Sequence, residues 1–138
     1  MGKKSKLKKV SSKKSSRLQI PLQLPINYDE KKPIFSFIYM KYGSKNCLSQ
    51  CDQNLKSLFA EKLLMLSQNT WKKIASIPKE GLGYEKIPIH QFKIPLLTVT
   101  PDVRSLMVFR FSGGERMAGI RENDIYHIYV IGKELYDH

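Results

Sequence analysis

The chain has 138 residues, with 24 Lys and Arg against 12 Asp and Glu, and a formal net charge of +12. This length suits one domain, and no stretch approaches the roughly 18 apolar residues that a membrane span needs. Two cysteines are too few for a secreted disulfide scaffold, and the basic N-terminus lacks the apolar region of a secretory signal. We therefore expect a soluble, cytoplasmic protein with no membrane contact.

The positive charge is concentrated near the N-terminus. Residues 1–19 hold eight Lys and Arg and no acid, whereas the rest of the chain holds sixteen bases and twelve acids. Residues 1–20 form a Lys/Ser segment with too few apolar residues to offset the entropy of ordering, so we expect a disordered tail. Clustered cations attract phosphate backbones. The candidate nucleic-acid-binding residues of the tail are Lys3, Lys4, Lys8, Lys9, Lys13, Lys14 and Arg17. The alternative is a solubilising tail.

The segment after the tail is predicted to be extended. Pro21 and Pro25 disfavour a helix, so residues 21–32 are expected to form a linker. A single α+β domain is expected over residues 33–138. Its first strand is predicted over Pro33–Tyr42, where apolar and aromatic residues alternate until Gly43 ends the run.

Helical spacing follows the predicted strand. The segment Leu48–Asn69 places apolar residues on one stripe, and Asp52 is a plausible N-cap. The stripe consists of Leu55, Leu58, Phe59, Leu63 and Leu66. A second helix is predicted over Thr70–Ser76, with Thr70 or Asn69 as its cap, and is closed by Pro78. The two helices would form a hairpin.

The segment between residues 79 and 101 has mixed signals. Gly81–Lys86 contains two glycines and is predicted to be a turn. Pro88 and Pro95 limit any strand over Ile87–Thr100 to a short or edge strand.

The C-terminal quarter of the chain, Arg104–His138, is predicted to form a three-stranded meander. Three runs rich in β-branched and aromatic residues are separated by turn signals at Ser112-Gly113-Gly114-Glu115 and Glu122-Asn123-Asp124. Strands joined this closely pair in sequence order and are antiparallel. The predicted fold is α+β, with an antiparallel sheet packed on one face against the N-terminal helical hairpin.

Alternation predicts the faces of the last strand. Ile125, His127, Tyr129 and Ile131 would share one face, and Tyr126, Ile128 and Val130 would share the other. His127 lies mid-strand among apolar neighbours, which favours a packed structural histidine over a catalytic one.

Motifs for metals and nucleotides are weak. Cys47 and Cys51 could offer two thiolates, but a second closely spaced ligand pair is missing, so we expect neither a metal site nor a cofactor. The Ser112-Gly113-Gly114 sequence is predicted to be a hairpin turn.

General acid–base chemistry on RNA is the remaining candidate. Metal-free cleavage needs His, Glu or Tyr for the proton transfers and Arg or Lys to stabilise the charge on phosphorus. The meander carries such groups in an unusual number on one small sheet. They are Arg104, Arg110, Arg116, Arg121, Tyr126, His127, Tyr129, Tyr136 and His138.

The order of elements and the C-terminal sequence resemble the RelE/ParE-like toxin fold of bacterial toxin–antitoxin systems. The local match runs Leu-Met-Val-Phe-Arg-Phe from Leu106, then Arg-Met-Ala-Gly-Ile-Arg-Glu-Asn-Asp-Ile-Tyr-His-Ile-Tyr-Val-Ile-Gly from Arg116, then Leu-Tyr-Asp-His from Leu135. The resemblance covers about residues 33–138 and consists of the order of residue types along the strands and the order of the elements. The basic tail and the proline-rich segment 81–101 depart from the family.

The resemblance implies a metal-independent endoribonuclease that acts on mRNA, usually in the ribosome, and is neutralised by an antitoxin protein. Arg110 and Arg121 would stabilise phosphate charge, and Tyr136 and His138 would transfer protons. Glu85 and Lys86 would be secondary catalytic candidates. Arg104 and Arg116 are candidate RNA contacts.

Two further interpretations stay open, because members of one fold differ in function. The first is a non-enzymatic nucleic-acid-binding or ribosome-associated module that uses the tail and the sheet arginines. The second is a phage or mobile-element accessory protein whose basic surface binds an acidic protein partner.

Overall fold

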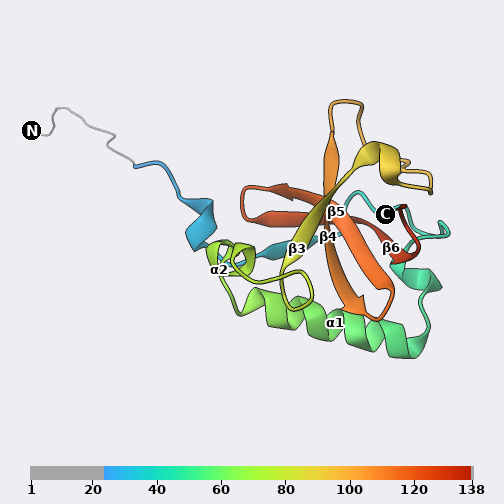
Figure 1. The fold of residues 1–138 in the computed structure, drawn as a ribbon, viewed down its shortest axis with the longest axis horizontal. Coiled ribbons are helices and arrows are strands. Elements are labelled where there is room, and N and C mark those ends of the chain that lie inside the picture. The colour runs from blue at the N-terminus through green and yellow to red at the C-terminus, as the bar shows by residue number, and fades with distance from the viewer. Residues whose placement is uncertain (1–23, 138) are drawn as a thin grey trace, which may run out of the picture.

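The structure, a computed structural model, describes residues 24–137. A five-stranded sheet with the order β2-β6-β5-β4-β3 forms the centre (Figure 1). Its strands are β2 (Ile34–Ser36), β3 (Tyr84–Pro88), β4 (Ser105–Ser112), β5 (Glu115–Glu122) and β6 (Ile125–Lys133). The helices are α1 (Gln53–Ser67) and α2 (Trp71–Ala75), with short 3-10 turns η1 (Tyr28–Glu30), η2 (Leu48–Gln50) and η3 (Ile89–Gln91). The expected disorder of residues 1–20 concerns a part of the chain outside the described residues.

The predicted meander is confirmed. β4, β5 and β6 pair antiparallel in chain order, and β3 extends the same pattern on the outer side of β4. Both predicted turns are present, with φ of +52° at Gly113 and +60° at Asn123. Glycine and asparagine are the residues that tolerate this backbone region best, so the two hairpins are set by local sequence.

The first strand departs from the prediction. β2 is three residues long and runs parallel to β6, so the sheet is mixed rather than wholly antiparallel. The chain turns away after Ser36, whose Oγ accepts a hydrogen bond from the Ile38 backbone N–H at 3.2 Å. The loop that follows lies along β6 beyond the end of β2, and its Asn46 carbonyl accepts a hydrogen bond from Ile131 N at 2.9 Å.

One main helix packs on the sheet. α1 begins after Asp52, whose carboxylate accepts a hydrogen bond from Leu55 N at 2.8 Å, as the sequence predicted. The helix was predicted to begin at Leu48, but Leu48–Gln50 form the separate turn η2. α2 is capped by Thr70 but has only five residues, which is too short to lie alongside α1. The prediction of a helical hairpin is therefore wrong for the described residues.

A β-bulge changes the faces of β6. Gly119 pairs with Ile128 and Ala118 pairs with Val130, so Tyr129 is an extra residue between the two pairs. The prediction that Ile131 shares a face with His127 is wrong, because Ile131 joins Tyr126 and Ile128 in the core beneath α1.

Both faces of the sheet are covered. The core on the α1 side includes Phe59, Leu66, Trp71, Phe109 and Tyr126. The core on the opposite face is covered by residues 89–103 and by the segment after β6, and it includes Leu106, Val108, Ala118, Val130 and Leu135. None of the helices within residues 24–137 is long and apolar enough to cross a membrane.

The bulge makes Gly119 intolerant of a side chain. A Cβ atom at this position would collide with the backbone carbonyl of His127 on the bulged strand. We expect Gly119→Ala to lower the free energy of unfolding by about 3 kcal/mol or more, measured by urea denaturation, because backbone atoms must shift to relieve the collision.

Gly81→Ala is the matched control for that substitution. A Cβ at Gly81 would approach its nearest neighbour at 3.4 Å, an ordinary contact, so its effect should stay within about 0.5 kcal/mol. Equal stability of the two variants would show that the β5–β6 register is wrong.

Candidate functional site

Five polar side chains meet on the sheet face opposite α1. We call them the Tyr136 cluster, and they are Lys79, Glu85, Arg110, Arg116 and Tyr136. Alternation in β3, β4 and β5 directs Glu85, Arg110 and Arg116 to this face, because they share the alternating positions of the buried residues Ile87, Val108 and Ala118. Tyr136 reaches the same face from the segment that follows β6.

Tyr136 lies at the centre of the cluster. Its phenol donates a hydrogen bond to Glu85 Oε2 at 3.2 Å and accepts one from Arg116 Nε at 2.9 Å. The Arg116 guanidinium also lies 5.9 Å from the centroid of the phenol ring. The Tyr136 side chain is almost completely buried, so these contacts fix the position of its hydroxyl.

Backbone pairing holds Tyr136 in place. Tyr136 forms an antiparallel bridge with Phe92, and the two aromatic rings lie 5.4 Å apart. On either side, Lys93 N donates to Leu135 O at 2.9 Å and Asp137 N donates to Gln91 O at 2.8 Å. The segment is therefore secured like a short strand.

Glu85 is surrounded by cations. Its Oε1 pairs with Lys79 Nζ at 3.1 Å, and Arg110 lies 3.9 Å from its Oε2. Burial raises the pKa of this carboxyl, but the hydrogen bond and charge of Lys79, the Tyr136 hydroxyl and the charge of Arg110 outweigh burial. The pKa of Glu85 therefore lies below its ordinary value, and the group is ionised at neutral pH.

Burial acts differently on Tyr136. It raises the pKa of the phenol, the charge of Arg116 opposes this, and the charge of Glu85 adds to it. The net pKa lies above the ordinary value of 10, so the hydroxyl is protonated at neutral pH. Tyr136 is thus a proton donor beside a carboxylate.

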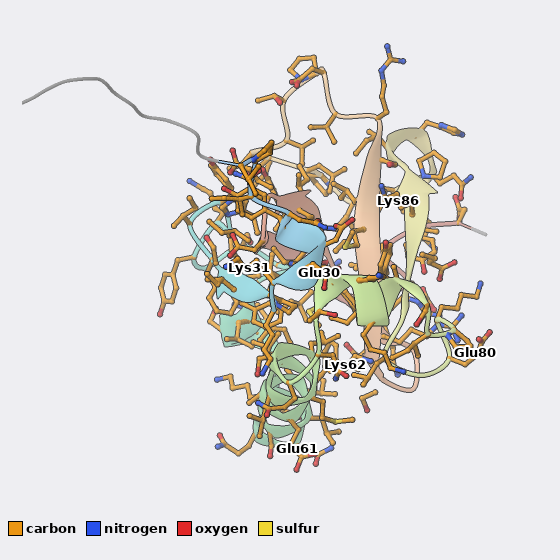
Figure 2. The ribbon with its side chains drawn as sticks, turned by 90° about the vertical axis from the view of Figure 1, so that its left-hand side faces the viewer. Glu30, Lys31, Glu61, Lys62, Glu80 and Lys86 are labelled. Carbon is orange, nitrogen blue, oxygen red and sulfur yellow. The ribbon has the colours of Figure 1, made fainter. Side chains whose placement is uncertain are left out.

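Arg110 also borders a hollow beside the cluster. Its side chain is about one-third exposed, and its Nε is buried without a hydrogen-bond partner among the described residues. The hollow beside it lies between α1 and the β4–β5 turn and includes Lys62 and Gly113. Figure 2 shows Lys62 on the sheet side of α1 and Glu61 on its outer side. Lys62 Nζ donates to the Gly81 carbonyl at 2.9 Å, and burial lowers its pKa.

No sequence pattern pointed to Lys79 as a site residue. This residue reaches Glu85 because the chain turns tightly, with Gly81 N and Gly83 N both donating to Pro78 O. The two glycines indicated a turn, but not the direction in which Lys79 would point. Glu85 and Lys86 lie on β3 rather than in the predicted turn.

Arg121 lies on the α1 side of the sheet, on the face opposite to the Tyr136 cluster. Its guanidinium stacks 4.5 Å from the centroid of the Trp71 ring and pairs with Asp29 at 2.8 Å. Its Nε donates to the Asn123 carbonyl at 2.6 Å. Arg121 therefore ties η1 and α2 to the β5–β6 turn.

The other predicted site residues are dispersed. Lys86 is exposed on the α1 side of β3, away from α1 itself (Figure 2), and shares a shallow hollow with Arg121. Arg104 is exposed just before β4. His138 and the tail cations lie outside the described residues. His127 is buried and its Nε2 lies 3.0 Å from Glu122, which fits the structural role predicted for it.

Within residues 24–137, no group of three His, Cys, Asp or Glu side chains is placed to hold a metal ion. Cys47 and Cys51 are free thiols.

Comparisons with protein-family models, with curated proteins and with solved structures found no match for this chain. The resemblance to RelE/ParE-like toxins therefore stays a prediction from the sequence.

Removing Arg121 should weaken the fold. We expect Arg121→Ala to lower the free energy of unfolding by about 2 kcal/mol, because the ring contact with Trp71 and two polar contacts are lost. Urea denaturation measures this. The control is Arg104→Ala, whose exposed side chain makes no hydrogen bond or ion pair with the described residues, so its stability should match the wild type. A fully stable Arg121→Ala protein would contradict the structural assignment.

Glu85 should make stability depend on pH. Because its folded pKa lies below the ordinary value of 4.5, the unfolded chain binds its proton more readily, and stability is lost as pH falls through the folded pKa. We expect the wild type to lose more stability than Glu85→Gln between pH 7 and pH 3, measured by urea denaturation at both pH values. An equal loss of stability in the two proteins would contradict the ion pairs assigned to Glu85.

Proposed function

We propose that the protein is a metal-independent endoribonuclease acting on mRNA, of the RelE-like toxin kind, with the Tyr136 cluster as its active site. The observation that carries the proposal is the position of one buried phenol between a carboxylate and a guanidinium. These three groups supply a proton donor, a proton acceptor and positive charge in one place.

The reaction would need no cofactor. The ribose 2′-oxygen attacks phosphorus while its proton passes to the Glu85 carboxylate, and the bond from phosphorus to the 5′-oxygen breaks. Tyr136 donates its proton to the leaving 5′-oxygen, which is favourable because a phenol is a stronger acid than an alcohol. The hydrogen bond between Tyr136 and Glu85 then provides a path for the proton to return.

Arginines would stabilise the additional negative charge on phosphorus. Arg110 and Arg116 stand directly opposite one another on β4 and β5. Arg116 and Lys133 also line a hollow on one side of the β4–β5 turn, while Arg110 lines the hollow on the other side. A single RNA strand could cross the turn with phosphates in both hollows.

The test uses purified full-length protein, end-labelled single-stranded RNA and excess EDTA. We expect products that carry a 2′,3′-cyclic phosphate and a 5′-hydroxyl. Tyr136→Phe should lower the cleavage rate by about 100-fold or more with unchanged RNA affinity, because it removes only the transferable proton. Arg110→Ala should weaken both affinity and rate.

Lys73→Gln serves as the control, since this exposed lysine lies on α2, outside the Tyr136 cluster. Cleavage that persists undiminished in Tyr136→Phe, or that disappears with EDTA, would overturn the proposed mechanism. In bacteria, tightly induced wild-type protein should arrest growth, and folded Tyr136→Phe should not.

A second candidate function is RNA binding without cleavage. It is favoured by the ionic partners of Glu85, because a carboxylate with a lowered pKa is a weak base. In that case RNA affinity would fall steeply with salt, and no RNA would be cut. The same RNA experiment distinguishes the two candidates.

A further inference from the structure

The loop between β2 and η2 exposes an apolar surface. We call it the rim patch, and its exposed members are Phe37, Ile38 and Tyr42, with relative exposures of 40%, 72% and 88%. The loop leads from β2 into α1, in teal at the right of Figure 1. Phe37 and Tyr42, but not Ile38, line an apolar hollow of about 420 Å³ together with Met40, Leu48 and Lys56. Large apolar side chains gathered around a hollow are typical of an interaction site.

The rim patch is held on a firm base. Tyr39 stacks on Tyr129 at 5.3 Å, and its carbonyl accepts a hydrogen bond from Thr98 Oγ1 at 2.7 Å. Met40 Sδ accepts a hydrogen bond from Leu48 N at 3.4 Å. The exposed side chains are therefore presented by a backbone that is anchored to the sheet, so little conformational entropy is lost when a partner binds.

Three lysines lie on or beside the loop that carries the rim patch. Lys56 lines the apolar hollow from α1, whereas Lys41 and Lys45 belong to the loop itself and line a separate hollow beside Tyr39 and Tyr129. None of the three forms an ion pair with a described residue. The nearby Asp52 carboxylate caps α1 through Leu55 N. The surface therefore combines apolar contact with lysines that form no ion pair among the described residues.

We propose that the rim patch binds an acidic, amphipathic segment of a partner protein. An apolar side chain of that segment occupies the hollow against Phe37 and Tyr42, and flanking carboxylates pair with Lys41, Lys45 and Lys56. The hollow between Phe37 and Tyr42 favours a peptide over a lipid bilayer, because it can enclose a single apolar side chain. This inference does not depend on the Tyr136 cluster, because no residue of that cluster belongs to the loop between β2 and η2.

The test measures binding of a fluorescein-labelled synthetic peptide to full-length protein by fluorescence anisotropy. In this peptide Leu and Phe recur every three or four residues along one helical face, and Glu occupies the opposite face. We expect saturable binding that weakens about tenfold in the combined variant K41Q/K45Q/K56Q, which removes three exposed charge pairs. Ile38→Ser with Tyr42→Ser should weaken binding by a similar factor. Both variants should fold, because the changed side chains are exposed.

The matched control is K31Q/K32Q/K73Q, which removes three exposed lysines elsewhere. It should bind the peptide as the wild type does. Equal weakening in the control would show non-specific electrostatic attraction and overturn the proposal. Saturable binding to phosphatidylserine vesicles that Ile38→Ser with Tyr42→Ser abolishes, without peptide binding, would identify a membrane surface instead. Full peptide binding by the serine variant would also contradict the proposal.

Discussion

The arrangement of this protein depends on one extra residue in β6. Tyr129 has no partner in β5, and its presence moves Ile131 to the core beneath α1 and Val130 to the opposite core. Gly119 makes the bulge possible, because its missing side chain leaves room for the carbonyl of His127. Tyr129 itself stacks on Tyr39 and secures the loop that carries the rim patch. One local irregularity thus sorts two cores and fixes a surface loop.

Local signals in the sequence predicted much of the fold. The turns at Gly113 and Asn123 and the caps at Asp52 and Thr70 depend on residues a few positions apart, and all four are present. Long-range features were not predictable in this way. The parallel pairing of β2 with β6 and the bulge at Tyr129 arise from contacts between distant segments, which alternation along one strand does not encode.

The same division applies to the candidate site. Alternation and chain order bring Glu85, Arg110 and Arg116 to one face, and the sequence had singled out all three for chemistry or RNA contact. Lys79 enters through the geometry of a glycine turn, and Arg121 is engaged by Trp71 and Asp29. Sequence composition identifies which residues are capable of chemistry. Only tertiary contacts decide which of them are close enough to act together.

The carbonyl of Asp124 joins parts of the chain that are remote in sequence. It accepts hydrogen bonds from Ile34 N of β2 at 2.9 Å and from the indole nitrogen of Trp71 at 3.1 Å. The meander can assemble from local hairpins, whereas β2 must close a long loop before it pairs with β6, so we expect β2 to dock late in folding. Trp71 is the single tryptophan of the chain, so its fluorescence would report the rate at which β2 docks.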